Sequence, residues 1–241
     1  MARQGYDRGH RRTRQRRAGS SDHPDGNESR YYDRTQNPVE FSRILNLSDG
    51  VFAIALTLLV LSLEIPPGLD TSDLYSELLN VTPMLVAFLV SVGIIALFWF
   101  SHYEIFAGVQ KIDGRLMWVN FGYLSLVAMI PFVQRLQGDY PFEAVVYMVY
   151  ASVLALLNLV DLWIHRHIYR AGLLKEQWSP YQYRTEMLRG TTLVIGFLIS
   201  IPLALVLVNW TILLWILLLP AEKFVIRWRA RTARDQPSDC L

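Results

Sequence analysis

The feature that most constrains this chain is a series of long apolar stretches. They lie at residues 51–63, 83–100, 116–133, 144–160 and 191–219. A bilayer core about 30 Å thick is crossed by about 20 helical residues. Of all residues, 52% are hydrophobic and 18% are charged, which is too apolar for an ordinary soluble domain of this length. The sequence therefore predicts an all-α polytopic membrane protein.

The last apolar stretch decides the number of spans. As one helix, residues 191–219 would reach roughly 44 Å at about 1.5 Å per residue, which is too long for one span and short for two. Pro202 would kink a single helix, whereas Asn209 beside Trp210 offers a polar break for a tight hairpin. A single helix gives five spans in total, and a hairpin gives six.

The distribution of basic residues favours six spans. With six spans and the N-terminus inside, every Lys and Arg except Arg135 falls in a cytoplasmic segment or tail. With five spans, the basic C-terminal tail would lie outside, against the rule that basic segments stay in the cytoplasm. We therefore expect six transmembrane helices per subunit and two cytoplasmic termini.

The ends of the chain are polar and differ from the middle. Residues 1–38 are rich in Arg and poor in aliphatic side chains, so we expect a disordered cytoplasmic tail. A solvated tail that fixes the topology is the favoured interpretation, with binding to anionic lipid as the alternative and no nucleic-acid partner expected. Residues 39–229 then form the six-helix membrane domain, and residues 230–241 form a short cytoplasmic C-terminal tail.

The first predicted helix carries polar residues at its start. A full span must include Ser48 and Asp49. An aspartate near a helix centre costs about 2.5–3.5 kcal/mol on insertion scales, which favours turning it toward a partner inside the bundle. Asp49 is therefore either a functional residue or a structural hydrogen-bonded acid, and both interpretations stay open.

The same helix carries a branched apolar stripe. At the helical period, the stripe has Gly50 and Thr57 on its border and consists of Val51, Ile54, Leu58, Leu61 and Ile65. Taken alone, such a stripe is most simply lipid-facing or part of the core.

Residues 43–50, with the sequence RILNLSDG, resemble the R-x-x-x-F-S-D-G signature of a known channel family. This is the family of endolysosomal and prokaryotic potassium channels called Transmembrane Protein 175. Leu47 stands where the family usually has phenylalanine. Residues 51–61 also resemble the family's continuation. Further matches in order and approximate spacing are the segment 98–102 (FWFSH), Asp113, Asn120 and the Pro131–Phe132 pair.

The resemblance implies a single-repeat subunit that assembles as a homotetramer in the cell membrane of a prokaryote. Four copies of the first helix would line one central pore, with the constriction at Ile54, Leu58 and Leu61 and with Thr57 beside it. By the same resemblance, one polar network would anchor this helix to its neighbours. Its members would be the signature residues Arg43, Ser48, Asp49 and Gly50, together with Trp99, His102, Asp113 and Asn120.

Such a pore would lack a carbonyl filter. No T-V-G-Y-G sequence is present, and aliphatic rings gate by dewetting and sieve by width. We expect passive flux of K⁺ with modest selectivity and no cofactor. Membrane lipid would be the surrounding partner. An acidic loop with Asp70, Asp73 and Glu77 could bias the outer mouth toward cations.

Other functions have weaker support. No nucleophile elbow, phosphate loop or zinc helix motif occurs, so an enzyme is not expected. Asp161, His165 and His167 have a spacing that could hold a metal, but beside Arg166 and Arg170 we interpret them as interfacial residues. The main alternative is a proton-linked secondary transporter or proton leak that uses intramembrane Asp and His side chains. A non-conducting membrane scaffold is the third.

Overall fold

The described part of the chain is a bundle of long helices. The computed structural model describes residues 31–63, 76, 78–79 and 81–217. Its long helices are α1 (Pro38–Leu59), α3 (Thr82–Gly108), α4 (Gly114–Asp139), α5 (Ala144–Ala171) and α6 (Pro180–Leu207). Short 3-10 turns η2 (Val60–Ser62) and η3 (Val208–Trp210) follow α1 and α6, and two short strands, β1 (Tyr31–Asp33) and β2 (Lys111–Asp113), complete the elements.

Five of these helices are long and apolar enough to cross a bilayer. They are Pro38–Ser62, Met84–Gly108, Gly114–Asp139, Ala144–Ala171 and Pro180–Leu207. These five coincide with the first five predicted spans. The sixth predicted span falls on residues 211–217, which are helical, and on residues outside the described part. The predicted tails at 1–30 and 230–241 also lie outside it.

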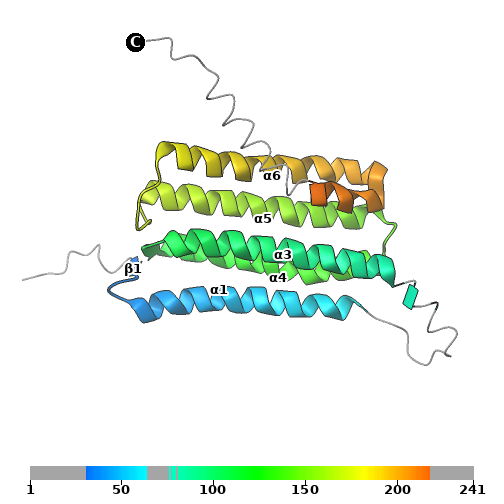
Figure 1. Ribbon diagram of the computed structural model, residues 1–241, viewed down its shortest axis with the longest axis horizontal. Helices are drawn as coiled ribbons and strands as arrows, with labels where there is room; N and C mark the ends of the chain where they lie inside the picture. The colour runs from blue at the N-terminus through cyan, green and yellow to red at the C-terminus, as the bar shows by residue number, and fades with distance from the viewer. Residues whose placement is uncertain (1–30, 64–75, 77, 80, 218–241) are drawn as a thin grey trace, which may run out of the picture. The chain divides into compact units, whose positions relative to one another are not determined.

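The helices are arranged with α1 at one edge. Helix α1 packs on α3 and α4, α4 packs on α5, and α5 packs on α6 (Figure 1). The side chains between these helices form a continuous core that includes Phe52, Tyr123 and Leu154. Because α1 has neighbours on one side only, its other side is not covered by any described helix.

The helix ends follow from local sequence. Asp113 caps the start of α4, where its Oδ1 accepts from the Leu116 backbone N–H over 2.7 Å. Ser179 and Gln182 form a capping box at the start of α6. Gly172 caps the C-terminal end of α5, and its φ of 65° is the left-handed conformation that favours glycine.

One end of the bundle is tied together by backbone pairing that the sequence did not predict. Strand β1 pairs antiparallel with β2, which links α3 to α4. The α5–α6 connection joins them, because the Gln110 N–H donates to Leu173 O over 2.7 Å and the Lys175 N–H donates to Gly108 O over 2.9 Å. We call residues 31–35, 107–113 and 173–175 the clasp. The pairing of β1 begins seven residues before the tail boundary predicted at residue 38.

Asp33 is the polar centre of the clasp. Its side chain accepts hydrogen bonds from the Thr35 hydroxyl (2.6 Å), the Thr35 backbone N–H (2.9 Å) and the Gln110 amide (3.1 Å). The Lys111 ammonium lies 3.4 Å from the other carboxylate oxygen. The hydrogen bonds from the Thr35 side chain and backbone, followed by those from Gln110 and Lys111, outweigh burial and lower the pKa of Asp33 to about 2.

At the other end of the bundle, the chain reverses after α6. Pro202 lies inside α6, which continues to Leu207, and Val208 then adopts a φ of 39°. Beyond this turn, the buried Trp215 donates from its indole N–H to the Ser200 hydroxyl over 3.2 Å. Its ring packs edge-on against Tyr150, with 4.9 Å between the centroids. Residues 211–217 therefore run back along α6 and α5, and the reversal lies at the predicted Asn209–Trp210 break.

Candidate functional site

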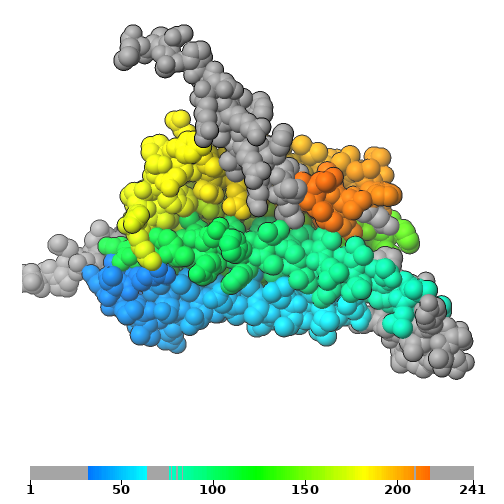
Figure 2. Space-filling model, in the orientation of Figure 1, coloured from blue at the N-terminus to red at the C-terminus, as the bar shows by residue number. Residues whose placement is uncertain are grey.

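Helix α1 has a buried face and an exposed face. The buried face carries Phe41, Ser48, Phe52, Ala55 and Leu59. The residues expected at a constriction lie on the exposed face, with 60% of Ile54, 43% of Leu58 and 59% of Leu61 accessible, and Thr57 is exposed beside them. Figure 2 shows the side chains of α1, blue to cyan, along one surface of the helical unit.

Two members of the predicted stripe behave differently from the rest. Val51 is only partly exposed and packs against the core, so it belongs to the flank of the exposed face. Ile65 lies outside the described residues. Gly50 is half-exposed, and a Cβ added there would meet no atom of this chain within 4 Å.

A chain of buried hydrogen bonds joins α1 to α3 and α4. The Asn120 amide nitrogen donates to the Ser48 hydroxyl oxygen over 3.0 Å, and Ser48 in turn donates to Ile44 O within α1. The Asn120 amide oxygen lies 2.9 Å from His102 Nε2. Since that oxygen can only accept, His102 must carry a proton on Nε2. Ser48, His102 and Asn120 are all buried, and each provides a hydrogen-bond partner for its neighbour in the chain.

Aromatic rings surround His102 and keep this chain away from the bundle surface. The imidazole stacks on Phe106 with 4.3 Å between ring centroids and on Tyr123 with 5.5 Å. Phe52 of α1 contacts both His102 and Tyr123. Sequence reasoning did not single out Phe52, Phe106 or Tyr123. Phe52 and Phe106 could have been predicted to lie on the same helix faces as Ser48 and His102, because each lies four residues after its partner.

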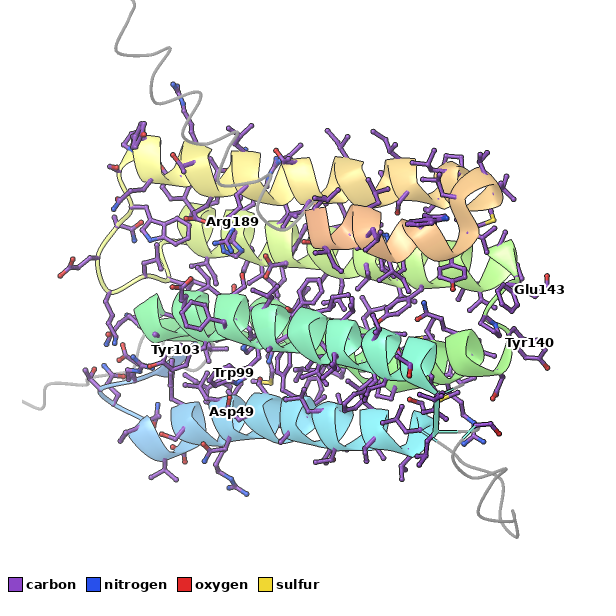
Figure 3. The ribbon with its side chains drawn as sticks, turned by 45° about the vertical axis from the view of Figure 1, so that its right-hand side comes forward. Asp49, Trp99, Tyr103, Tyr140, Glu143 and Arg189 are labelled. Atoms are coloured by element: carbon purple, nitrogen blue, oxygen red, sulfur yellow. The ribbon has the colours of Figure 1, made fainter. Side chains whose placement is uncertain are left out.

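Asp49 is held separately, near the surface. The Trp99 indole N–H donates to Asp49 Oδ1 over 3.0 Å, and both residues are exposed (Figure 3). Tyr103, one turn further along α3, stacks on Trp99 with 5.8 Å between ring centroids. Asp49 and Trp99 are thus brought together, but beside the buried chain of Ser48, Asn120 and His102.

The other expected network members lie elsewhere. Asp113 caps α4 with one carboxylate oxygen, and its other oxygen lies 2.8 Å from His167 Nε2 on α5. The sequence analysis interpreted His167 as an interfacial residue, with a metal site as the alternative, and missed this partner. Arg43 is exposed, and within the described part of the chain its side chain makes no hydrogen bond or ion pair with this network.

The three residues with metal-like spacing do not converge. His165 Nδ1 lies 2.9 Å from Asp161 O and 3.4 Å from the Asp161 carboxylate, whereas His167 faces Asp113. Among the described residues, no group of three or more His, Cys, Asp or Glu side chains has the geometry of a metal site. The His165–Asp161 contact thus lies within α5, whereas the His167–Asp113 contact joins α5 to the start of α4.

Comparison with known proteins places these features in a family context. Residues 43–131 match the family model described as endosomal/lysosomal potassium channel TMEM175. A potassium channel of Chamaesiphon minutus is 38% identical over 133 residues, which cover 52% of this chain and 66% of the relative. A potassium channel of Streptomyces collinus is 32% identical over 137 residues, which cover 55% and 66%. These matches thus span just under two thirds of each relative.

The fold is also similar to a solved structure. The crystal structure of a lysosomal potassium-selective channel TMEM175 homolog from Chamaesiphon minutus superposes with a TM-score of 0.68 at 27% sequence identity. The superposition covers 78% of this chain and 98% of that chain. The structural match thus extends well beyond the residues that carry the sequence match.

Proposed function

Because this chain belongs to the TMEM175 family of ion channels and is not an enzyme, we propose that it forms a potassium-permeable cation channel lined by α1. The observation that carries this proposal is the exposure of Ile54, Leu58 and Leu61 on the side of α1 that no described helix covers. In a homotetramer, four such faces would enclose one pathway. The apolar rings would form its constriction and would gate by dewetting.

The composition of the exposed face argues against simple contact with lipid. Opposite the buried Ser48 and Phe52, the helix presents Asn46, Gly50 and Thr57. By comparison, the side chains that α6 exposes along its outer half are apolar, namely Ile195, Leu198, Ile199, Pro202, Leu205 and Val206. Polar groups are costly in hydrocarbon, so the face of α6 suits lipid and the face of α1 suits a water-filled path or another subunit.

Thr57 is oriented to favour cations. Its hydroxyl donates to Ile54 O over 2.9 Å, so its only proton is used within the helix. The oxygen lone pairs are left for the exposed side. A ring of four such oxygens, next to the Ile54 ring, would present oxygen lone pairs to a passing K⁺. The hydroxyl hydrogens would point away from the ion. This supports a cation preference without a carbonyl filter.

Gly50 supports assembly from several copies. Within this chain there is room for a side chain at this position. A side chain at this position would then be limited only by a neighbouring subunit, because small residues let the helices of a membrane assembly approach closely. We propose that Gly50 faces a neighbouring subunit of the tetramer.

The buried chain of Ser48, Asn120 and His102 would hold the pore helix in register. Asp49 with Trp99, and Asp113 with His167, would brace it on either side. We also propose that this anchor is rigid, so that changes of pore width come from rotation of the apolar side chains. Arg43, which is exposed on α1, would face the cytoplasmic entrance.

The proposed setting is the cell membrane of a prokaryote, with the clasp and both termini in the cytoplasm. All described Lys and Arg residues except Arg135 lie on α1 before residue 44 or toward the clasp end, which supports this orientation. The acidic residues expected at the outer mouth, Asp70, Asp73 and Glu77, lie outside the described residues. We propose K⁺ as the permeating ion, with no cofactor.

A proton pathway is the second candidate. It is favoured by one observation, that a buried histidine, His102, sits in a hydrogen-bonded chain next to the proposed pore helix. Purified protein in liposomes separates the two. Flux of K⁺ that follows its own gradient, with a proton ionophore to carry the compensating charge, supports the channel. Proton flux without K⁺ flux would contradict it.

A further inference from the structure

A polar cavity lies between the first half of α1, the second half of α3 and the clasp. Its volume is about 390 Å³, and two cationic side chains of the clasp, Arg34 and Lys175, line it. Sites for small molecules usually have a volume of roughly 300–1,000 Å³, so the cavity is large enough for a ligand. Neither cation has a role in the proposed pore.

The two cations meet at one carbonyl oxygen. Arg34 Nη1 donates to Ala107 O over 3.2 Å, and the Lys175 ammonium donates to the same oxygen over 3.0 Å. Ala107 lies in the last turn of α3, where the helix dipole favours cations. Among the described residues, however, no carboxylate lies within ion-pair distance of either side chain. Two like charges that share one acceptor repel each other, so an anion beside them would be stabilised.

Packing holds the Arg34 guanidinium in position. Its Cζ lies 4.5 Å from the ring centroid of Phe41, which is buried in α1. A guanidinium and an ammonium each have several N–H donors, so the bonds to Ala107 O leave donors for a ligand. The Asn46 amide and the Tyr103 hydroxyl also line the cavity and add neutral donors. This arrangement suits an anion with several acceptor oxygens.

One acidic residue, Asp49, lines the same cavity farther from the clasp. It accepts from Trp99, which precedes Ala107 by about two helical turns and lies roughly 12 Å from it along α3. Figure 3 shows Asp49 and Trp99 in the space between α3 and α1, with Tyr103 nearer to the clasp. The cavity is therefore positive at the clasp and negative deeper in the bundle. A lipid bound at the clasp would have to lay its acyl chains past this carboxylate, whereas a soluble ligand would not.

We propose that Arg34 and Lys175 bind a phosphate group at the clasp end of this cavity. A phosphate monoester carries a charge of roughly −1.5 to −2 at pH 7 and three strong acceptor oxygens, and the arginine fork matches two of them. Because Arg34 and Lys175 come from separate segments of the clasp, the ligand bridges these segments and holds them together. The position of Asp49 favours a soluble phosphate over an anionic lipid headgroup. Only the cytoplasmic location of this site rests on the proposed function.

Hydrogen exchange in the clasp measures such binding. A ligand that binds only the closed clasp reduces its opening by a factor of 1 + [L]/Kd, so exchange of residues 31–37 and 173–176 should be about tenfold slower at ten times Kd. The purified full chain is titrated with pyrophosphate, with sodium chloride of the same ionic strength as the reference, and separately with phosphatidic acid in mixed micelles. Slowing by pyrophosphate supports a soluble ligand, and slowing by phosphatidic acid alone supports a lipid headgroup at the same phosphate site. No slowing by either would overturn the proposal.

Variants assign the effect to this cavity. Arg34→Gln and Lys175→Gln should each remove most of the slowing, whereas Arg115→Gln, at an exposed arginine near the same end of the bundle, should keep it. This comparison is needed because the arginines of residues 1–30 also attract anions.

If either charge variant does not yield a monodisperse protein, Ser42→Trp fills the cavity from an exposed position and keeps both cations. Slowing that persists in Ser42→Trp, or that is lost equally in Arg115→Gln, would refute this location. Exchange is measured without ion flux, so failure of this proposal is distinguishable from failure of the proposed channel.

Discussion

Asn120 of α4 donates a hydrogen bond to the Ser48 hydroxyl of α1 over 3.0 Å, inside the core and 72 residues apart in the sequence. The oxygen of the same amide accepts a hydrogen bond from His102 of α3. A single side chain thus connects three helices, and one of them is the proposed pore helix. The position of α1 in the bundle is therefore sensitive to this one residue.

Replacing Asn120 with Leu should destabilise the protein. Leucine fills a similar volume but leaves the Ser48 hydroxyl and His102 Nε2 without their partner, and an unsatisfied buried polar group costs about 1–3 kcal/mol. Thermal unfolding in detergent should show a clearly lower midpoint. Ser125→Ala is the matched control, because Ser125 is exposed on the same helix and its hydroxyl donates to Phe121 O within that helix. Equal midpoints for the two variants would show that the hydrogen bonds to Asn120 contribute nothing.

The Asp49–Trp99 pair should contribute little to stability, because both side chains are exposed. Trp99→Phe and Asp49→Asn should each cost less than about 1 kcal/mol, the usual range for surface charge interactions. Trp99→Phe removes this hydrogen bond, whereas Asp49→Asn keeps an amide oxygen that can still accept it, so the double variant should be hardly worse than Trp99→Phe alone. The free energy of unfolding of the three variants measures this coupling. Trp118→Phe, at an exposed tryptophan of α4, is the control. Strict additivity would mean that the two side chains act independently.

The clasp should weaken only in strong acid. The pKa of Asp33 is lowered from 3.8 to about 2, so the folded state favours the carboxylate. Its stabilisation is complete above about pH 4 and is lost as the pH falls through about 2. Hydrogen exchange of residues 31–37, corrected for intrinsic rates, should be constant from pH 7 to 4. Asp33→Asn should raise it at every pH, and the exposed Asp139→Asn should not. A fall in protection already between pH 7 and 5 would contradict this role of Asp33.

The topology can be read from the one cysteine of the chain, Cys240. With six spans it should be cytoplasmic, so a membrane-impermeant maleimide should label it only after cells are permeabilised. In a Cys240→Ser background, Asp139→Cys lies at the end of the bundle away from the clasp and should be labelled in intact cells. Labelling of both Cys240 and Asp139→Cys in intact cells would mean that an even number of spans separates the two positions, which would contradict the six-span topology.

The helices and the turn after α6 could be predicted because their signals are local. Apolar length marks each span, and Asn209 with Trp210 marks the reversal. Ser48 and Asp49 were singled out through the local signature motif, and Trp99 and Asn120 through their order and approximate spacing in the resemblance. The partition of these residues into a buried chain and an exposed pair could not be predicted, since it depends on how α3 rotates against α1.

The clasp was missed for a different reason. Tyr31–Asp33 lies in a polar segment with no strand periodicity, and its partner Lys111–Asp113 is about 80 residues away. A three-residue strand is fixed by such pairing rather than by its own propensity. The link from Asp113 to His167 was missed on the same grounds, because it joins the start of α4 to the end of α5.

The most direct test of the pore assignment is potassium flux through Leu58→Ala and Leu58→Asn variants in liposomes. Leu58 lies in the middle of the proposed constriction, so the smaller or more polar side chain should widen or wet it. Leu198→Ala, an exposed leucine of α6, is the matched control. Flux of K⁺ should rise severalfold for both Leu58 variants, with discrimination against Na⁺ reduced, and should be unchanged for Leu198→Ala. Wild-type flux and selectivity in both Leu58 variants would contradict a pore lined by this face of α1.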